Sequence, residues 1–167
     1  MVPDFGLTAQ KSISAPVGMV GALSFLGASA IEASGGSAAN TVAGVASFGG
    51  KAAFIGKVAD DQLGRVFRHD MKAIGCVFTT PPLAEGPATA QSLINVTADA
   101  QRTMSTYLGA CVELTPADVD PAIIEAAQIS YLEGYLFDPP EARRAFAKAA
   151  ALAHGSGRKI ALTLSDS

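Results

Sequence analysis

The sequence predicts an α/β domain in which helices cover a mostly parallel β-sheet. From residue 32 onward, short apolar runs of strand character alternate with segments of helical spacing. These helical segments are long enough to act as the crossover connections that neighbouring parallel strands require. The chain of 167 residues is 49% hydrophobic and 16% charged, which suits one folded domain and argues against a disordered chain.

Turn residues mark where these elements begin and end. Glycine pairs flank the first helix, Asp60 or Asp61 caps the second, and Thr-Pro or Asp-Pro pairs stand where the later helices start. The polar turn 99–101 joins two strand-like segments into a hairpin. We expect helices over 38–48, 61–74, 115–127 and 139–155, and strands over 51–58, 88–97, 102–108, 128–137 and 159–164.

Residues 1–31 do not follow this alternation, and we leave them unassigned as an irregular N-terminal segment. The uncharged stretch 12–31 resembles a secretory signal, but its glycines and the single preceding Lys11 argue against a cleaved one. It is also too rich in small residues for a membrane span. We therefore expect a cytoplasmic protein without a membrane partner. A secreted α/β binding domain is the alternative if the stretch is cleaved.

Charge and metal-binding residue types narrow the possible partners further. Twelve basic against 15 acidic residues leave a net charge of −3, which gives no electrostatic footprint for nucleic acid. Cys76 and Cys111 are too few for a disulfide framework or a zinc site. His69 and His154 fall on helix surfaces without a second ligand nearby, so we expect no metal site.

The glycine pair before the first helix is the most informative feature of the chain. Gly35 and Gly36 allow a ligand to approach the backbone, and the free N–H groups of a helix start can donate to its oxygens. Asn40 lies on the first turn, where its amide suits two neighbouring hydroxyls of a sugar. The alternative is a plain glycine-rich turn. No G-x-G-x-x-G follows a strand here, so a dinucleotide site is not expected.

With the segment GKVADDQLG at 56–64, these residues resemble the first signature of the PfkB, or ribokinase-like, family of sugar and nucleoside kinases. That signature consists of G-G-x-x-x-N, a small-residue helix, a Gly-Gly turn, an apolar strand and G-x-V-x-D-D-x-x-G. Segments 102–104, 107–110 and 131–134 are similar to members close to adenosine kinase. The resemblance runs from residue 32 to 167.

The resemblance implies the N-terminal half of a ribokinase-like three-layer sandwich, with the hairpin as a small β lid element. Such lids often pair with a second subunit, so a homodimer is possible. Gly35, Gly36 and Asn40 would contact substrate hydroxyls, and Glu133 would lie near the sugar at the carboxyl end of its strand. Alternatively, Glu133 is an ordinary strand-end carboxylate. Lys57 is either a binding residue or, the interpretation we favour, a solvated strand-end lysine.

The resemblance also implies an activity: transfer of the ATP γ-phosphoryl group, with Mg²⁺, to a hydroxyl of a sugar or nucleoside. The family's catalytic signature, D-T-x-G-A-G-D, occurs nowhere in the 167 residues. We therefore assign no catalytic residue and expect residues 32–167 to be the N-terminal portion of a kinase domain, inactive alone and without the nucleotide site. The alternative is a non-catalytic, truncated kinase fragment that at most binds a polyol.

Overall fold

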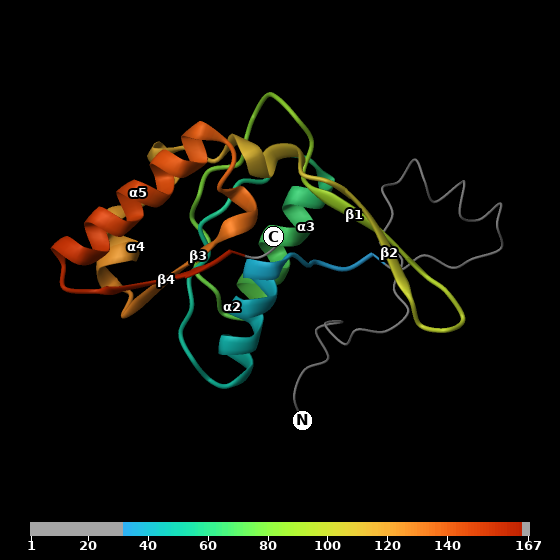
Figure 1. The fold of residues 1–167 in the computed structure, drawn as a ribbon, viewed down its shortest axis with the longest axis horizontal. Coiled ribbons are helices and arrows are strands. Elements are labelled where there is room, and N and C mark those ends of the chain that lie inside the picture. The colour runs from blue at the N-terminus through green and yellow to red at the C-terminus, as the bar shows by residue number, and fades with distance from the viewer. Residues whose placement is uncertain (1–31, 165–167) are drawn as a thin grey trace.

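The computed structural model describes residues 32–164 (Figure 1), so the expectations for residues 1–31 lie outside the described part of the chain. The elements, in chain order, are the helices and strands α2 (Ser37–Ser47), α3 (Gln62–Ala73), β1 (Gln91–Val96), β2 (Arg102–Tyr107), η1 (Gly109–Glu113), η2 (Pro116–Asp118), α4 (Pro121–Ala126), β3 (Ile129–Glu133), η3 (Gly134–Leu136), α5 (Pro140–Gly155) and β4 (Lys159–Thr163), where η marks a 3₁₀-helix.

Parallel strand pairing confirms the predicted α/β class. β3 and β4 pair in parallel from Ile129 with Lys159 to Glu133 with Thr163, and α5 forms the crossover between them. The chain from 51 to 59 also pairs in parallel, through the isolated bridges Ala53–Val77 and Ala59–Leu83. The strand expected over 51–58 is therefore reduced to bridges, and its partner segment was not expected as a strand.

α2 begins where the glycine pair ends. Gly36 has a φ of +104°, a value that L side chains rarely adopt, and it precedes the first helical residue, Ser37. Ala39 and Ala43 are the buried residues of the helix. The helix ends before Gly49, which has a φ of +79°. Local glycine chemistry thus fixes both ends of this element, as the sequence predicts.

α3 begins at a side-chain cap. Asp61 accepts a hydrogen bond from the Gly64 amide at 2.7 Å and one from the Thr89 amide at 2.9 Å. These bonds join the helix start to the segment that leads into β1. A Cβ added at Gly64 would lie 2.0 Å from the carbonyl oxygen of Ala59, so the close approach requires glycine. The expected role of Asp61 as a cap is confirmed.

The single helix expected over 115–127 is wrong. Over these residues the chain forms the short 3₁₀-helix η2 and then the short helix α4, and η1 precedes both. Pro116 and Pro121 each open a new turn, because proline has no N–H to donate to the preceding turn. Thr115 and Asp118 form a reciprocal capping box around η2, which stabilises it as a separate turn.

The hairpin is confirmed. β1 and β2 pair antiparallel from Gln91 with Tyr107 to Val96 with Arg102, and Ala100 in the turn has a φ of +65°. Figure 1 shows this ribbon extending away from α4, α5, β3 and β4. Every residue of β2 is exposed. The hairpin is therefore covered by little of the described chain.

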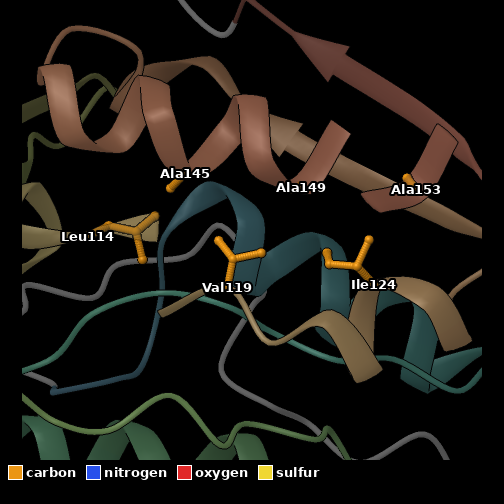
Figure 2. Close-up of a cluster of buried hydrophobic side chains, with 6 residues drawn as sticks. All are labelled: Leu114, Val119, Ile124, Ala145, Ala149 and Ala153. Carbon is orange, nitrogen blue, oxygen red and sulfur yellow. The ribbon is translucent and has the colours of Figure 1, made fainter. Parts of the chain in front are cut away.

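Small residues on α5 allow the main core to pack closely. Ala142, Ala145, Ala149 and Ala153 are the buried residues of this helix. Figure 2 shows three of these alanines facing the aliphatic side chains of the connection before β3; this cluster consists of Leu114, Val119, Ile124, Ala145, Ala149 and Ala153. A second core lies between α2 and α3, where the rings of Phe54, Phe67 and Phe78 meet edge to face.

Candidate functional site

The start of α2 meets the end of β3. Ser37, the first residue of the helix, donates a hydrogen bond of 2.6 Å from Oγ to Oε2 of Glu133, the last residue of the strand. The two residues are 96 positions apart in the chain. This contact brings the glycine pair and Glu133, which the sequence analysis proposed for one site, to the same place.

The second oxygen of Glu133 has no partner among the described residues. Oε1 is buried and accepts no hydrogen bond there. A buried carboxylate oxygen without a donor costs free energy, because it has lost water without replacing it. A hydrogen-bond donor on a ligand can therefore satisfy this oxygen.

Backbone lies close beside Glu133. A Cβ added at the next residue, Gly134, would lie 2.5 Å from the carbonyl oxygen of Thr163 and 2.8 Å from that of Leu164. Glycine at this position thus lets the chain after β3 pass directly against the end of β4. The carboxyl ends of both parallel strands lie at the same edge of the pair, where ligands gather in open α/β sheets.

The glycine loop itself is open. A Cβ added at Gly35 or Gly36 would meet no atom within 4 Å, so neither glycine is required by packing against the described residues. The positive φ of Gly36 still requires glycine for conformational reasons. Asn40 lies one turn further along α2, and it is exposed. Its contact with a ligand remains a prediction.

A serine before the glycine pair is also fixed. Ser34 donates a hydrogen bond of 2.5 Å from Oγ to Oδ2 of Asp70 on α3. Serine hydroxyls on both sides of the glycine pair are therefore bonded to carboxylates of two different elements. The sequence analysis did not propose Ser34 or Ser37, although the symmetric pattern Ser-Gly-Gly-Ser was a visible signal.

The interpretation of Lys57 as a solvated lysine is wrong. Its Nζ forms an ion pair of 2.5 Å with Oδ1 of Asp118, and the two side chains are only 12% and 6% exposed. Lys57 therefore stabilises the contact between the segment 51–59 and η2. Asp60, in contrast, lies at the surface and pairs with Arg65 at 3.3 Å.

The part of the chain that the structure describes does not provide a metal site. Between residues 32 and 164 no group of His, Cys, Asp and Glu side chains is arranged to hold a metal ion. His69 lies at the surface, 3.2 Å from the carboxylate of Asp70, and His154 is exposed at the end of α5. No helix of the described residues is long and apolar enough to cross a membrane.

Known proteins resemble this chain in sequence and in structure. An adenosine kinase of known structure from Sinorhizobium meliloti is 52% identical and superimposes with a TM-score of 0.80, covering 93% of this chain and 47% of that one. Fructokinase-2 of Solanum lycopersicum is 29% identical over 129 residues, 76% of this chain and 39% of that protein. The 5-dehydro-2-deoxygluconokinase of Halalkalibacterium halodurans is 32% identical over 134 residues, 78% of this chain and 40% of its own length.

The chain thus spans under half the length of these relatives, and its described residues form part of a ribokinase-like α/β fold. The model of the pfkB family of carbohydrate kinases matches residues 5–167. That match includes most of the segment 1–31, which the sequence analysis left unassigned. Since it covers nearly the whole chain, this protein belongs to the pfkB carbohydrate kinase family.

Proposed function

We propose that this chain is the substrate-binding half of an ATP-dependent kinase that phosphorylates a hydroxyl of a sugar or nucleoside. The observation that carries the proposal is the hydrogen bond between Ser37 and Glu133. It joins the glycine-rich helix start to the carboxyl end of β3, and relatives of this chain are named adenosine kinase, fructokinase and 5-dehydro-2-deoxygluconokinase.

The chemistry of the site favours a hydroxyl-rich ligand. The N–H groups at the start of α2 can donate to hydroxyl oxygens, and Oε1 of Glu133 can accept a hydrogen bond from a hydroxyl. The amide of Asn40 can do both. A ligand that satisfies all three needs several neighbouring hydroxyls. We favour a nucleoside or ribose-like substrate, because the adenosine kinase is 52% identical to this chain.

ATP and Mg²⁺ belong to the proposal through the family, because kinases of this family use ATP as the phosphoryl donor. The described residues do not fit a metal ion, and the catalytic signature D-T-x-G-A-G-D is absent from the sequence. We therefore derive no catalytic step from this chain. Its own residues bind and orient the acceptor, and we expect the isolated chain to bind without turnover.

A titration of the ¹⁵N-labelled chain with adenosine, ribose and fructose tests this function. We expect amide shifts at Gly35 and Gly36, and Asn40→Ala should weaken binding of the preferred ligand about tenfold or more. Ser47→Ala is the matched control, since its hydroxyl bonds the carbonyl of Gly44 at the other end of α2. Binding that leaves these amides unshifted contradicts the proposed site. If the purified chain phosphorylates one of these ligands and Asn40→Ala abolishes this activity, the proposed lack of turnover is wrong.

A second candidate is a non-catalytic fragment that binds a polyol weakly. The chain covers 47% of the adenosine kinase and 39% of the fructokinase, so what its gene encodes beyond residue 167 decides between the two candidates. Sequencing the transcript beyond Ser167 separates the two candidates. A downstream D-T-x-G-A-G-D in frame supports the kinase half, and a stop codon supports the fragment.

The exposed hairpin supports a homodimer as a further part of the proposal. Met104 and Tyr107 of β2 are 55% and 52% exposed, and exposed apolar side chains on a strand pair favour association with a second copy. Sedimentation velocity at tens of micromolar measures the association. Met104→Lys should weaken it, and an unchanged dimer in this variant would place the interface elsewhere.

A further inference from the structure

We propose that Ser37 is a positioning residue for substrate binding: its hydroxyl holds the Glu133 carboxylate in the orientation that leaves Oε1 ready to accept a substrate hydroxyl. This inference rests on the proposed function and identifies a residue of the same site. Ser37 lies between the glycine pair and Asn40, and its own role is to orient another residue.

The hydrogen bond is short and has a charged acceptor. Oγ of Ser37 lies 2.6 Å from Oε2 of Glu133, a distance typical of a hydroxyl that donates to a carboxylate. A serine hydroxyl has one proton, so a Ser37 that donates to Glu133 cannot donate to a ligand as well. Its oxygen can still accept a hydrogen bond from a ligand, so the double variant with Glu133→Gln tests whether the effect of Ser37 passes through the carboxylate.

The state of Oε1 shows what the bond achieves. A free glutamate side chain has several rotamers and would turn both oxygens toward water or toward donors. Here Oε1 is buried and has no partner within residues 32–164, while Oε2 is bonded to Ser37. The serine therefore offsets part of the cost of keeping a desolvated acceptor at the end of β3. Such preorganisation reduces the ordering that a ligand must bring about on binding.

The loop that carries Ser37 is fixed at its other end. Ser34 bonds Asp70 of α3 at 2.5 Å, so the glycine pair lies between two anchored residues. The start of α2 cannot shift away from β3 without breaking one or both of these bonds. Ser37 thus holds Glu133 from a fixed point and not from a freely moving loop.

This role makes a chemical prediction about selectivity. An ionised carboxylate oxygen only accepts hydrogen bonds, so Oε1 favours a ligand that has a hydroxyl at that point and gains nothing from its deoxy analogue. Loss of the Ser37 hydroxyl should therefore weaken the hydroxylated ligand more than the deoxy analogue. A purely structural role of Ser37 would weaken both equally.

Calorimetric titration of the chain with adenosine, 2′-deoxyadenosine and 3′-deoxyadenosine tests the proposal. We expect Ser37→Ala to raise the Kd for adenosine about tenfold and to raise the Kd for one deoxy analogue less than twofold. Ser37→Thr retains the hydroxyl and should restore adenosine binding. Ser47→Ala, on the same helix, should leave all Kd values unchanged. In the background of Glu133→Gln, adding Ser37→Ala should raise the Kd for adenosine by less than a further twofold.

Ser37→Cys provides a second variant if Ser37→Ala does not fold, because the thiol is similar in size and a weak donor. An equal loss for all ligands, or no loss, overturns the positioning role. If Asn40→Ala still abolishes adenosine binding in that case, the proposed function survives without it. If the unaltered chain binds none of the ligands, while circular dichroism shows it folded, both proposals are wrong.

Discussion

Replacing Lys57 by methionine should destabilise the fold far more than removing an ordinary surface charge. Lys57 and Asp118 are 12% and 6% exposed and lie 2.5 Å apart. The other oxygen of Asp118, Oδ2, accepts from the amide and the hydroxyl of Thr115 at 2.9 and 3.0 Å. Lys57→Met therefore leaves Oδ1 of a buried carboxylate without its cation, and the capping box holds that carboxylate in place.

The size of the effect follows from this burial. Removing one partner of a buried ion pair costs about 3–5 kcal/mol, because the remaining charge is left desolvated. A small domain has only about 5–15 kcal/mol of stability in total. Arg65 provides the matched control, since it pairs with Asp60 at 3.3 Å while the side chains are 65% and 61% exposed. Breaking that pair should cost about 1 kcal/mol or less.

Urea unfolding followed by circular dichroism measures both effects. We expect the free energy of unfolding to fall by about 3 kcal/mol or more in Lys57→Met and to change little in Arg65→Met. Lys57→Met combined with Asp118→Asn should recover part of the loss, because the buried site then holds no unpaired charge. Equal effects of the two methionine variants would refute the argument from burial.

Three further predictions concern local features of the fold. Burial alone would raise the pKa of Asp61, but hydrogen bonds from Thr89 and Gly64 outweigh it and lower the pKa. The stabilising effect of Asp61 is therefore present at neutral pH and is lost as the pH falls below about 4. In Asp61→Asn, the free energy of unfolding should fall less steeply over this acid range. Gly64→Ala should lower the free energy of unfolding by about 2 kcal/mol, because its Cβ would lie 2.0 Å from a carbonyl oxygen. Gly44→Ala, whose Cβ would meet no atom within 4 Å, should stabilise α2 slightly in the same urea assay. The opposite order of stabilities would contradict the geometry. Burial raises the pKa of the Cys76 thiol to about 11, so mass spectrometry at pH 8 should find it alkylated by iodoacetamide on the order of 100-fold more slowly than free cysteine, and alkylation at the free rate would show that the thiol is accessible.

Elements with local end signals could be predicted from the sequence. Gly36 and Gly49 delimit α2, and Asp61 caps α3, because glycine conformation and side-chain capping depend on residues within one or two turns. The prediction of one helix over 115–127 is wrong for a related reason. Pro116 and Pro121 each start a helical turn, as the sequence predicts, but the two turns are separate and short. A single helix is interrupted at the second proline, because proline has no N–H to donate to the preceding turn.

Long-range contacts could not be predicted in the same way. The partner of Lys57 lies 61 residues away, and nothing in the sequence around Lys57 indicates that Asp118 faces it. The segment that pairs with 51–59 was also not predicted, because its bridges at Val77 and Leu83 lie on either side of two consecutive prolines, which indicate a break in a strand. In both cases the deciding interaction forms only when segments distant in the chain pack together.

The candidate site depends both on local sequence signals and on contacts between distant segments. Among the described residues, buried polar atoms without a partner occur at two places on β3, Oγ of Ser130 and Oε1 of Glu133, so such an atom alone does not mark a site. Ser130 lies within the strand, beside Ile160 of β4. Glu133 lies at the carboxyl end, where the helix start that follows Gly36 reaches it through Ser37. The glycine pair supplies open backbone, and the serine supplies orientation. At this end of β3 the desolvated Oε1 of Glu133 and the start of α2 are joined through Ser37, and the proposed ligand would contact both.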